Sequence, residues 1–286
     1  MKKAPNARLM LCLSMAVFGT LGLFTRNIPV TSGELALYRA VLASLLLGGY
    51  FAVTRQKLDL KAIRKELPLL LLSGALMGIN WILLFQAYRY TTVSVATLIY
   101  YFAPLIVTVV STFLFREKLT GKQIFCFAMS TVGLVLIVGI GDLGSTSPKG
   151  VLFGLGAACF YASVVLLNKF IKNVGGIQRT LLQFLAAIVV LTPYVAVTSG
   201  FHLEVLDATG WICLLVVGLI HTGIMYCLYF TSVQHLPGQE VSILSYIDPL
   251  MAVLVSVLLL REPMTLSQAV GGAMILGFTL WNEKNS

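Results

Sequence analysis

Charge is scarce in this sequence. Only 11% of its 286 residues are Asp, Glu, Lys or Arg, whereas 58% are hydrophobic. A typical globular chain carries about 25% charged residues, so this composition does not supply the surface of a soluble protein. No basic patch is interleaved with aromatic residues, which excludes a nucleic-acid-binding surface. The composition therefore predicts a polytopic membrane protein rather than a soluble enzyme.

Motifs of cofactor- and metal-dependent enzymes are also missing. The five cysteines lie within apolar runs and form no C-x-x-C pair, so we interpret them as buried apolar residues. No Walker motif is present, which excludes ATP as the direct energy source, and neither G-x-S-x-G nor H-E-x-x-H occurs. We expect no cofactor, no metal site and no catalytic residue.

Ten runs are long and apolar enough to cross a bilayer, which takes about 17–25 residues per helix. Asp, Glu, Lys and Arg occur in only two of the runs, as Arg39 and Asp248. Most of the loops are short, so no extramembrane domain is expected. The predicted spans are 9–25, 35–54, 67–88, 91–115, 124–141, 150–168, 180–198, 210–233, 241–260 and 264–281.

The distribution of basic residues predicts the orientation of these spans. If the N-terminus is inside the cell, 15 Lys and Arg residues fall on the inner side and 4 on the outer side. Basic residues resist translocation, so the richer side is the cytoplasmic one. We expect a multi-pass protein of the cell membrane, with both termini in the cytoplasm.

The sequence contains an internal repeat with an offset of 145 residues. Residues 101–123 and 246–268 are identical at nine of 23 positions. The repeat divides the chain into two five-helix halves, 8–141 and 149–282. Because five is odd, the second half crosses the membrane in the opposite sense, as in many secondary transporters. The predicted fold is an all-α bundle of ten transmembrane helices, formed by two inverted five-helix repeats around a central cavity.

Paired motifs in the two halves carry a family resemblance. They are Arg-Glu-Lys-Leu-Thr at 116–120 and Arg-Glu-Pro-Met-Thr at 261–265, together with Ala16-Val17-Phe18-Gly19 and Leu37-Tyr38-Arg39. These motifs resemble the EamA-type branch of the drug/metabolite transporter superfamily, although Phe18 stands where that family usually has tryptophan. The resemblance covers nearly the whole chain, and it implies transport of a small molecule without naming it.

Polar residues within the spans are the candidates for a substrate cavity, because hydrocarbon disfavours exposed hydroxyls and amides. A helical stripe of the fourth span contains Ser94, Thr97, Tyr101 and Pro104, and its repeat mates are Gln239, Ser242, Tyr246 and Pro249. Helix packing is the alternative role of such stripes. The two prolines are interpreted as hinges or as fixed kinks. Further cavity candidates, each also explained by packing, are Asn80, Trp81, Tyr161, Asn168, Thr222, Met225 and Tyr229.

Three ionisable residues lie within the predicted spans. Asp248 has either a proton-coupling or a structural role. Arg39 either binds a carboxylate of the cargo, pairs with Asp248 or Glu34, or extends its long side chain toward the membrane surface. His221 is either a proton relay or a hydrogen-bonded structural group. Each of these alternatives remains open from sequence alone.

The leading hypothesis is a secondary transporter that exports a small organic metabolite, an amino acid or a related compound, by alternating access. One alternative is a flippase for a lipid or lipid-linked sugar. A remote alternative is an intramembrane aspartyl protease. Gly139-Ile140-Gly141-Asp142 resembles the G-x-G-D signature of such proteases, and Asp248 would be the second carboxylate. The expected partners are a small-molecule substrate and the lipid bilayer, without nucleic acid. Both a monomer and a homodimer are compatible with the sequence.

Overall fold

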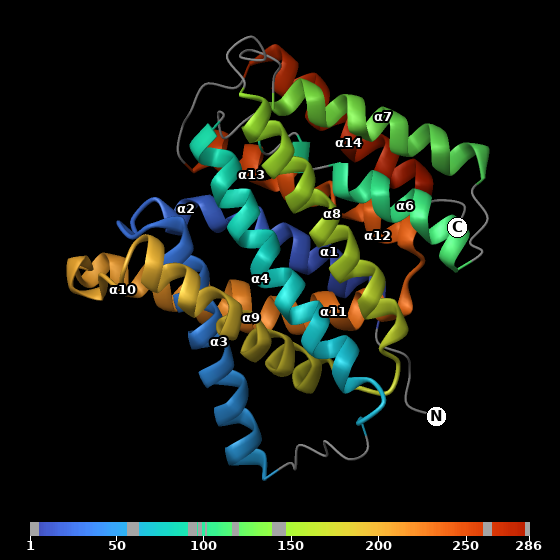
Figure 1. The fold of residues 1–286 in the computed structure, drawn as a ribbon. Helices are drawn as coiled ribbons and strands as arrows, with labels where there is room; N and C mark the ends of the chain where they lie inside the picture. The colour runs from blue at the N-terminus through green and yellow to red at the C-terminus, as the bar shows by residue number, and fades with distance from the viewer. Residues whose placement is uncertain are drawn as a thin grey trace.

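The protein is helical throughout the part of the chain that the structure describes, and that part contains no strand (Figure 1). The structure is a computed structural model. It describes residues 6–55, 63–90, 96, 99–100, 102–115, 120–138, 147–259 and 265–283. An all-helical fold is what a bilayer demands, because helices satisfy every backbone hydrogen bond internally.

Within the described residues, six segments are long and apolar enough to cross a membrane, and three shorter apolar helices accompany them. The prediction of ten spans is therefore supported only in part, and much of the fourth run lies outside the described residues. The helices are α1 (Ala7–Phe18), α2 (Leu21–Thr25), α3 (Ser32–Thr54), α4 (Leu67–Tyr90), α6 (Phe102–Leu114), α7 (Gly121–Val138), α8 (Pro148–Phe170), α9 (Gly176–Thr198), α10 (Ala208–Leu215), α11 (Met225–His235), α12 (Gly238–Leu244), α13 (Ile247–Leu258) and α14 (Leu266–Glu283). A 3-10 turn (Leu203–Val205) precedes α10, and a π-helix (Val216–Ile224) joins α10 to α11.

Local capping sets where several helices begin. Thr31 and Glu34 form a reciprocal capping box, so α3 starts three residues before the predicted span. Ser147 caps α8, whose first residue is Pro148, and proline suits this position because its fixed φ is already helical. Asp207 accepts a hydrogen bond from the backbone N–H of Gly210 at 2.7 Å and caps α10.

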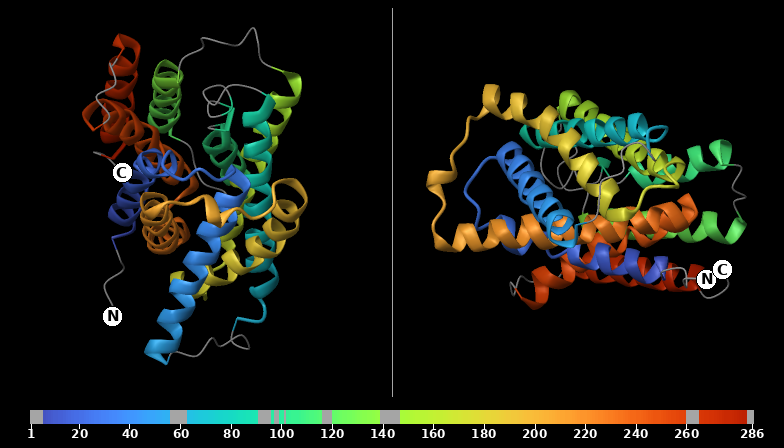
Figure 2. Two further views of the ribbon diagram at one scale, coloured as in Figure 1. Left: turned by 90° about the vertical axis from the view of Figure 1, so that its left-hand side faces the viewer. Right: turned by 90° about the horizontal axis from the view of Figure 1, so that it is seen from below.

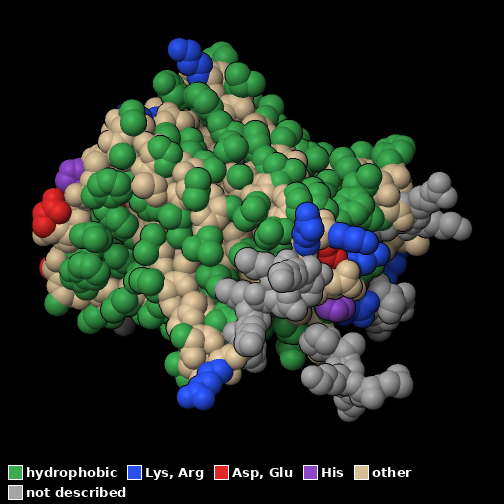
Figure 3. Space-filling model, turned by 60° about the horizontal axis from the view of Figure 1, so that its bottom comes forward, with side chains coloured by type: hydrophobic (Ala, Val, Ile, Leu, Met, Phe, Trp, Pro, Cys, Tyr) green, Lys and Arg blue, Asp and Glu red, His purple; other side chains and the backbone are tan. Residues whose placement is uncertain are grey.

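The surface of the bundle is largely apolar (Figure 3). Long apolar side chains point outward from the helices, and Val53, Phe113 and Val197 are each more than 80% exposed. Exposure on this scale is costly in water and favourable in lipid. The protein is thus a multi-pass membrane protein.

The ends of the helices gather on two opposite faces. We call the face where α1 begins the terminal face; α1 is joined there to the start of α12 by an ion pair between Arg8 and Glu240. The carboxylate of Glu66, before α4, accepts hydrogen bonds from the backbone N–H groups of Lys172 and Asn173, which follow α8. Helix α1 begins and α14 ends toward this face, on the right of the right-hand view in Figure 2.

The opposite face, which we call the distal face, is joined by other contacts. Glu34 at the start of α3 accepts a 2.8 Å hydrogen bond from the backbone N–H of His202, beyond the end of α9. The ammonium of Lys149, at the start of α8, lies 6.0 Å from the ring centroid of Tyr90 at the end of α4. Successive long helices therefore run between the two faces in alternating directions.

Glycines bring the helices close together inside the bundle. At Gly74 of α4 a Cβ atom would meet the backbone of Gln183 in α9. At Gly133 of α7 it would come within 2.7 Å of the carbonyl oxygen of Gly271 in α14. Close backbone approach of this kind is a common device of helix pairs in membranes, and it fixes the frame around the centre of the bundle.

Candidate functional site

An aromatic cluster occupies the middle of the bundle. Tyr226 of α11 is its central member, with ring centroids 5.1 Å from Phe18 of α1, 5.3 Å from Phe184 of α9 and 6.5 Å from Trp81 of α4. Tyr229 lies one turn further along α11, 6.1 Å from Tyr226. Rings from four helices thus converge at one level, an arrangement typical of pockets for small organic molecules.

Arg39 of α3 reaches this cluster. It is the eighth residue of its helix, about 11 Å along the axis from the helix start at 1.5 Å per residue. The carbon at the centre of its guanidinium lies 4.1 Å from the ring centroid of Trp81, a cation–π contact. Trp81 is only 4% exposed, so the guanidinium lies inside the bundle and does not extend to the membrane surface.

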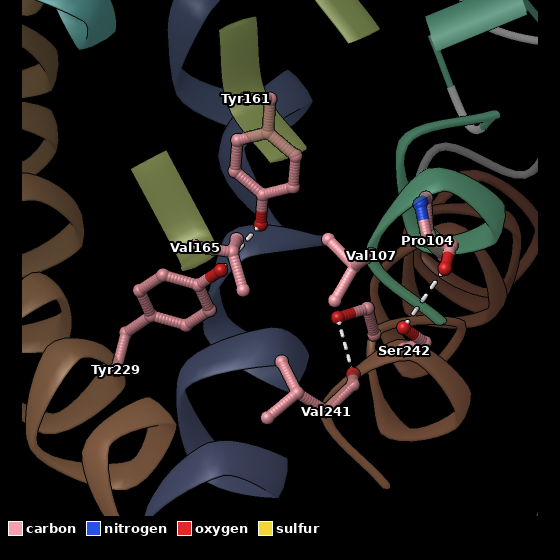
Figure 4. A pocket seen from close by; sticks show the side chains of 8 residues that line it. Pro104, Val107, Tyr161, Val165, Tyr229, Val241 and Ser242 are labelled. Carbon is pink, nitrogen blue, oxygen red and sulfur yellow. Dashed lines mark hydrogen bonds between the residues drawn. The ribbon is translucent and has the colours of Figure 1, made fainter. Parts of the chain in front are cut away.

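Tyr161 of α8 closes the cluster on a second side. Its hydroxyl and that of Tyr229 are 2.7 Å apart and share a hydrogen bond (Figure 4). A cavity of about 10 Å³ lies beside this pair, and its border is formed by Pro104, Val107, Val165, Val241, Ser242 and Ser245. It has room for about one water molecule, so the centre of the bundle is nearly closed in this conformation.

The terminal side of this cavity is tightly packed. Val107 of α6, Val165 of α8 and Val241 of α12 are each at most 2% exposed. Ser242 donates hydrogen bonds to the carbonyl oxygens of Pro104 at 3.0 Å and Gly238 at 2.8 Å, and so attaches α12 to α6. With the Arg8–Glu240 ion pair beyond it, this packing separates the aromatic cluster from the terminal face.

The chain is interrupted beside the cluster, between α12 and α13. The break falls at Ser245 and Tyr246, and Asp248 and buried Pro249 follow it in the first turn of α13. Asp248 lies close enough to Tyr161 and Tyr226 to interact with both electrostatically. Interrupted helices of this type commonly border substrate sites in secondary transporters.

Tyr246 lies apart from the other candidate rings. It is fully buried, its hydroxyl is 2.8 Å from that of Thr131 in α7, and its ring packs on Phe127. The helical stripe placed it on a pathway wall, whereas here it fills the contact between α13 and α7. Helical spacing identifies a shared face but not the neighbour that the face meets, and the break at this residue turns its side chain.

Asn80 and Asn168 also make contacts between helices. Asn80 donates a 2.7 Å hydrogen bond to the carbonyl oxygen of Ala157 in α8. Asn168 donates to the hydroxyl of Ser73 at 3.1 Å and accepts from Gln183 at 3.0 Å, and so links α8, α4 and α9. Both side chains are at most 1% exposed in this conformation.

The π-helix holds His221 and Thr222. The Nε2 atom of His221 is 2.9 Å from the hydroxyl of Thr20, beside the break between α1 and α2. Thr222 donates to the carbonyl oxygen of Val217 at 2.8 Å, five residues earlier. Met225 directly follows the π-helix, and its carbonyl oxygen accepts a hydrogen bond from Ser14 of α1. These contacts join the π-helix to the first span.

Three predicted cavity residues, Ser94, Thr97 and Tyr101, lie outside the described residues. Three members of the cluster were not among the predicted cavity residues: Phe18, Tyr226 and Phe184. Tyr226 had a signal available, since it is three residues before Tyr229 and therefore on the same side of the helix. Phe184 had none, because a phenylalanine in an apolar run looks like any other core residue.

A second cavity, of about 200 Å³, opens beside α6, α7 and α12. Its walls are largely apolar, with Leu105, Val109 and Phe127 among them, and Gln239 and Gln123 border it. Gln239 is 3% exposed, and its side-chain nitrogen has no hydrogen-bond partner among the described residues. This cavity is separate from the aromatic cluster.

Helical spans with alternating directions, an interrupted helix and a polar, aromatic centre define the class: a multi-pass membrane transporter. Comparison with known proteins identifies the family. The EamA-like transporter family matches residues 6–139 and again residues 148–282. The chain belongs to the EamA-like transporter family.

Individual relatives agree with this assignment. The chain is 30% identical over 279 residues to the uncharacterized transporter YxxF of Bacillus subtilis (strain 168), a match that covers 96% of this chain and 88% of that protein. It is 26% identical over 204 residues to the uncharacterized inner membrane transporter YhbE of Escherichia coli (strain K12), covering 68% and 64% of the two chains. One crystal structure superposes with a TM-score of 0.83 at 18% identity, over 97% of this chain and 96% of the other, and so shares the fold.

Proposed function

We propose that this protein is a secondary transporter that exports a small organic metabolite, an amino acid or a related compound, by alternating access. The observation that carries the proposal is the aromatic cluster with its single arginine, enclosed midway between the two faces. The cluster and Arg39 together can bind a small molecule while it is inside the protein. The names of the relatives favour transport over catalysis.

Alternating access needs a site that is reached from one side at a time. The packed valines and the Arg8–Glu240 ion pair lie between the cluster and the terminal face. On the distal side the cluster is looser, since Phe18, Tyr161 and Tyr226 are each only partly buried. We interpret this conformation as closed toward the terminal face.

Helix contacts support the proposed inverted repeats, 8–141 and 149–282. The spans are counted here as in the ten-span prediction. In the proposed repeats α4 corresponds to α11, and α1 corresponds to α8. Helix α4 packs on α8, and their counterparts α11 and α1 also pack on each other. Likewise α4 packs on α9 while the π-helix packs on α3, and α6 packs on α8 while α13 packs on α1. Each of these three contacts between the halves thus has a partner in which the halves exchange roles. Such exchange is what converts a conformation open to one side into one open to the other.

We place the terminal face in the cytoplasm of a cell membrane, because basic residues concentrate in the segments assigned to that side. Export then means uptake of cargo at the terminal face and release at the distal face. Asp248 and His221 are our candidates for proton coupling. Asp248 lies beside the helix break and the cluster, and the hydrogen-bonded position of His221 favours a supporting role.

The test is solute counterflow. Purified protein in liposomes is loaded with an unlabelled compound that raises its melting temperature, and the labelled compound is added outside. We expect transient accumulation of label, driven by the outward gradient of the unlabelled compound and without ATP or an imposed ion gradient, since a secondary transporter exchanges cargo through a single site. Liposomes that contain the unlabelled compound but no protein are the control. No accumulation above this control, for any compound that binds, would contradict the proposal.

A further inference from the structure

In the part of the chain that the structure describes, Arg39 is a cation without an anionic partner. Its Nε atom is buried and has no hydrogen-bond partner among the described residues. Within that same part of the chain no ion pair involves Arg39. A guanidinium presents five N–H donors, and a charge held among rings within a membrane is expensive unless it is paired. The guanidinium of Arg39 therefore has N–H donors available for a hydrogen-bond acceptor from a ligand.

The carboxylates nearby do not meet this demand. Glu34, on the same helix, accepts hydrogen bonds from Thr31, Tyr38 and His202 at the distal end. Asp248 acts electrostatically on the phenol groups of Tyr161 and Tyr226, and in the described part of the chain no ion pair joins it to Arg39. Glu34 is thus engaged at the distal end, and the guanidinium of Arg39 is left facing the cluster.

The surroundings of Arg39 limit the charge of a ligand. The ionisable side chains that interact with it in the described part of the chain are Tyr100, Tyr226 and His221, and none is a second lysine or arginine. A doubly charged phosphate would leave one charge uncompensated in this setting. A carboxylate carries one charge and matches the two-pronged geometry of a guanidinium.

We propose that Arg39 binds the carboxylate of the cargo, while Trp81, Tyr226 and Phe18 hold its apolar body. This inference rests on the proposed function, for which it names the substrate class: small organic acids with an apolar side. Trp81 holds the guanidinium plane by stacking on it, so that its N–H edge stays available to a ligand. Phe184 supports Trp81 from behind, with ring centroids 6.4 Å apart and nearly parallel planes.

The test compares acids with their own amides, which keep the shape and remove the charge. The probes are 3-phenylpropionate, 4-methylpentanoate and indole-3-acetate, each beside its primary amide. Binding to the purified full-length protein is measured by thermal shift over a range of probe concentrations. At least one acid should raise the melting temperature while its amide does not. Equal shifts for every acid and amide, or no shift for any acid, would overturn the proposal.

Variants then connect the effect to this residue. Arg39→Gln should weaken binding of the acid about tenfold to a hundredfold, the usual effect of losing charged hydrogen bonds, and should leave amide binding unchanged. Arg39→Lys keeps the charge but not the planar fork, and should fall between. Arg26→Gln, at an exposed arginine, is the matched control. If Arg39→Gln melts earlier yet binds the acid as well as the wild type, Arg39 is structural and the proposal is wrong.

This test separates the ligand class from transport itself. Binding of an acid that depends on Arg39, without counterflow in liposomes, would overturn the proposed function and leave the binding site standing. If a neutral compound shows counterflow and Arg39→Gln does not change it, the proposed function stands and the proposed ligand class is wrong.

Discussion

Replacing Arg179 should destabilise the protein more than any other single loss of charge. This arginine is completely buried at the start of α9. Its guanidinium donates to the carbonyl oxygens of Asn168, Ile171, Val174 and Phe230, and to the side chain of Gln234. It thereby fastens the ends of α8 and α11 to the start of α9.

The expected magnitude follows from these bonds. A hydrogen bond to a charged group contributes about 1.5–3 kcal/mol, so five bonds give a simple sum above about 7 kcal/mol. The sum overstates the loss, because the carbonyls lie near the terminal face and water replaces part of the donation. We expect Arg179→Met to lower the free energy of unfolding by about 3–5 kcal/mol, the range found when a buried charge network is broken.

The assay is thermal unfolding of purified protein in one detergent. For a chain of this size, 1 kcal/mol corresponds to roughly 2–4 °C, so the melting temperature should fall by about 6–20 °C. Arg179→Lys should lose less, because an ammonium still serves some of the carbonyls, and Arg26→Met should change little. A melting temperature of Arg179→Met equal to that of Arg26→Met would refute the reasoning.

Three further predictions follow from other contacts. Gly74→Ala should lower the melting temperature because its Cβ meets the backbone of α9, whereas Gly48→Ala, with open space around it, should be neutral or slightly stabilising. Tyr229→Phe should be more costly than the double change that also converts Tyr161, since one buried hydroxyl alone is left without its partner; the thermal stabilities of the three variants form the test cycle. Cysteines introduced at positions 63–66 should react with impermeant reagents only from the cytoplasm, and labelling from outside would reverse the assigned orientation.

Sequence periodicity locates helices well and their interruptions poorly. The run 67–88 corresponds closely to α4, and 150–168 to α8. The run 210–233 contains α10, a π-helix and α11, because hydropathy measures burial in lipid and does not report which carbonyl each N–H meets. Hydropathy does not locate the break at Ser245–Tyr246 for the same reason, although Pro249 close by indicates a disturbed helix.

The candidate site was predictable in its members more than in its arrangement. Arg39, Trp81, Tyr161 and Tyr229 were candidates because polar or bulky rings in a span need a reason to be there, and the structure brings them to one cluster. Tyr246 was a candidate for the same reason, but it packs on α7. Arg179 was counted only as a loop charge, since the sequence around it does not show that acceptors from α8, from α11 and from the loop before α9 surround it.

The central claim is that one site in the middle of the bundle is exposed to the two faces in turn, so locking one face should stop transport. In a variant without its native cysteines, Arg8→Cys and Glu240→Cys are joined by a short thiol-cleavable linker, and counterflow is compared before linkage, after linkage and after cleavage. The account predicts that linkage abolishes counterflow and cleavage restores it, while Arg8→Cys alone is unaffected by the reagent. Undiminished counterflow through the linked protein would contradict alternating access at this face.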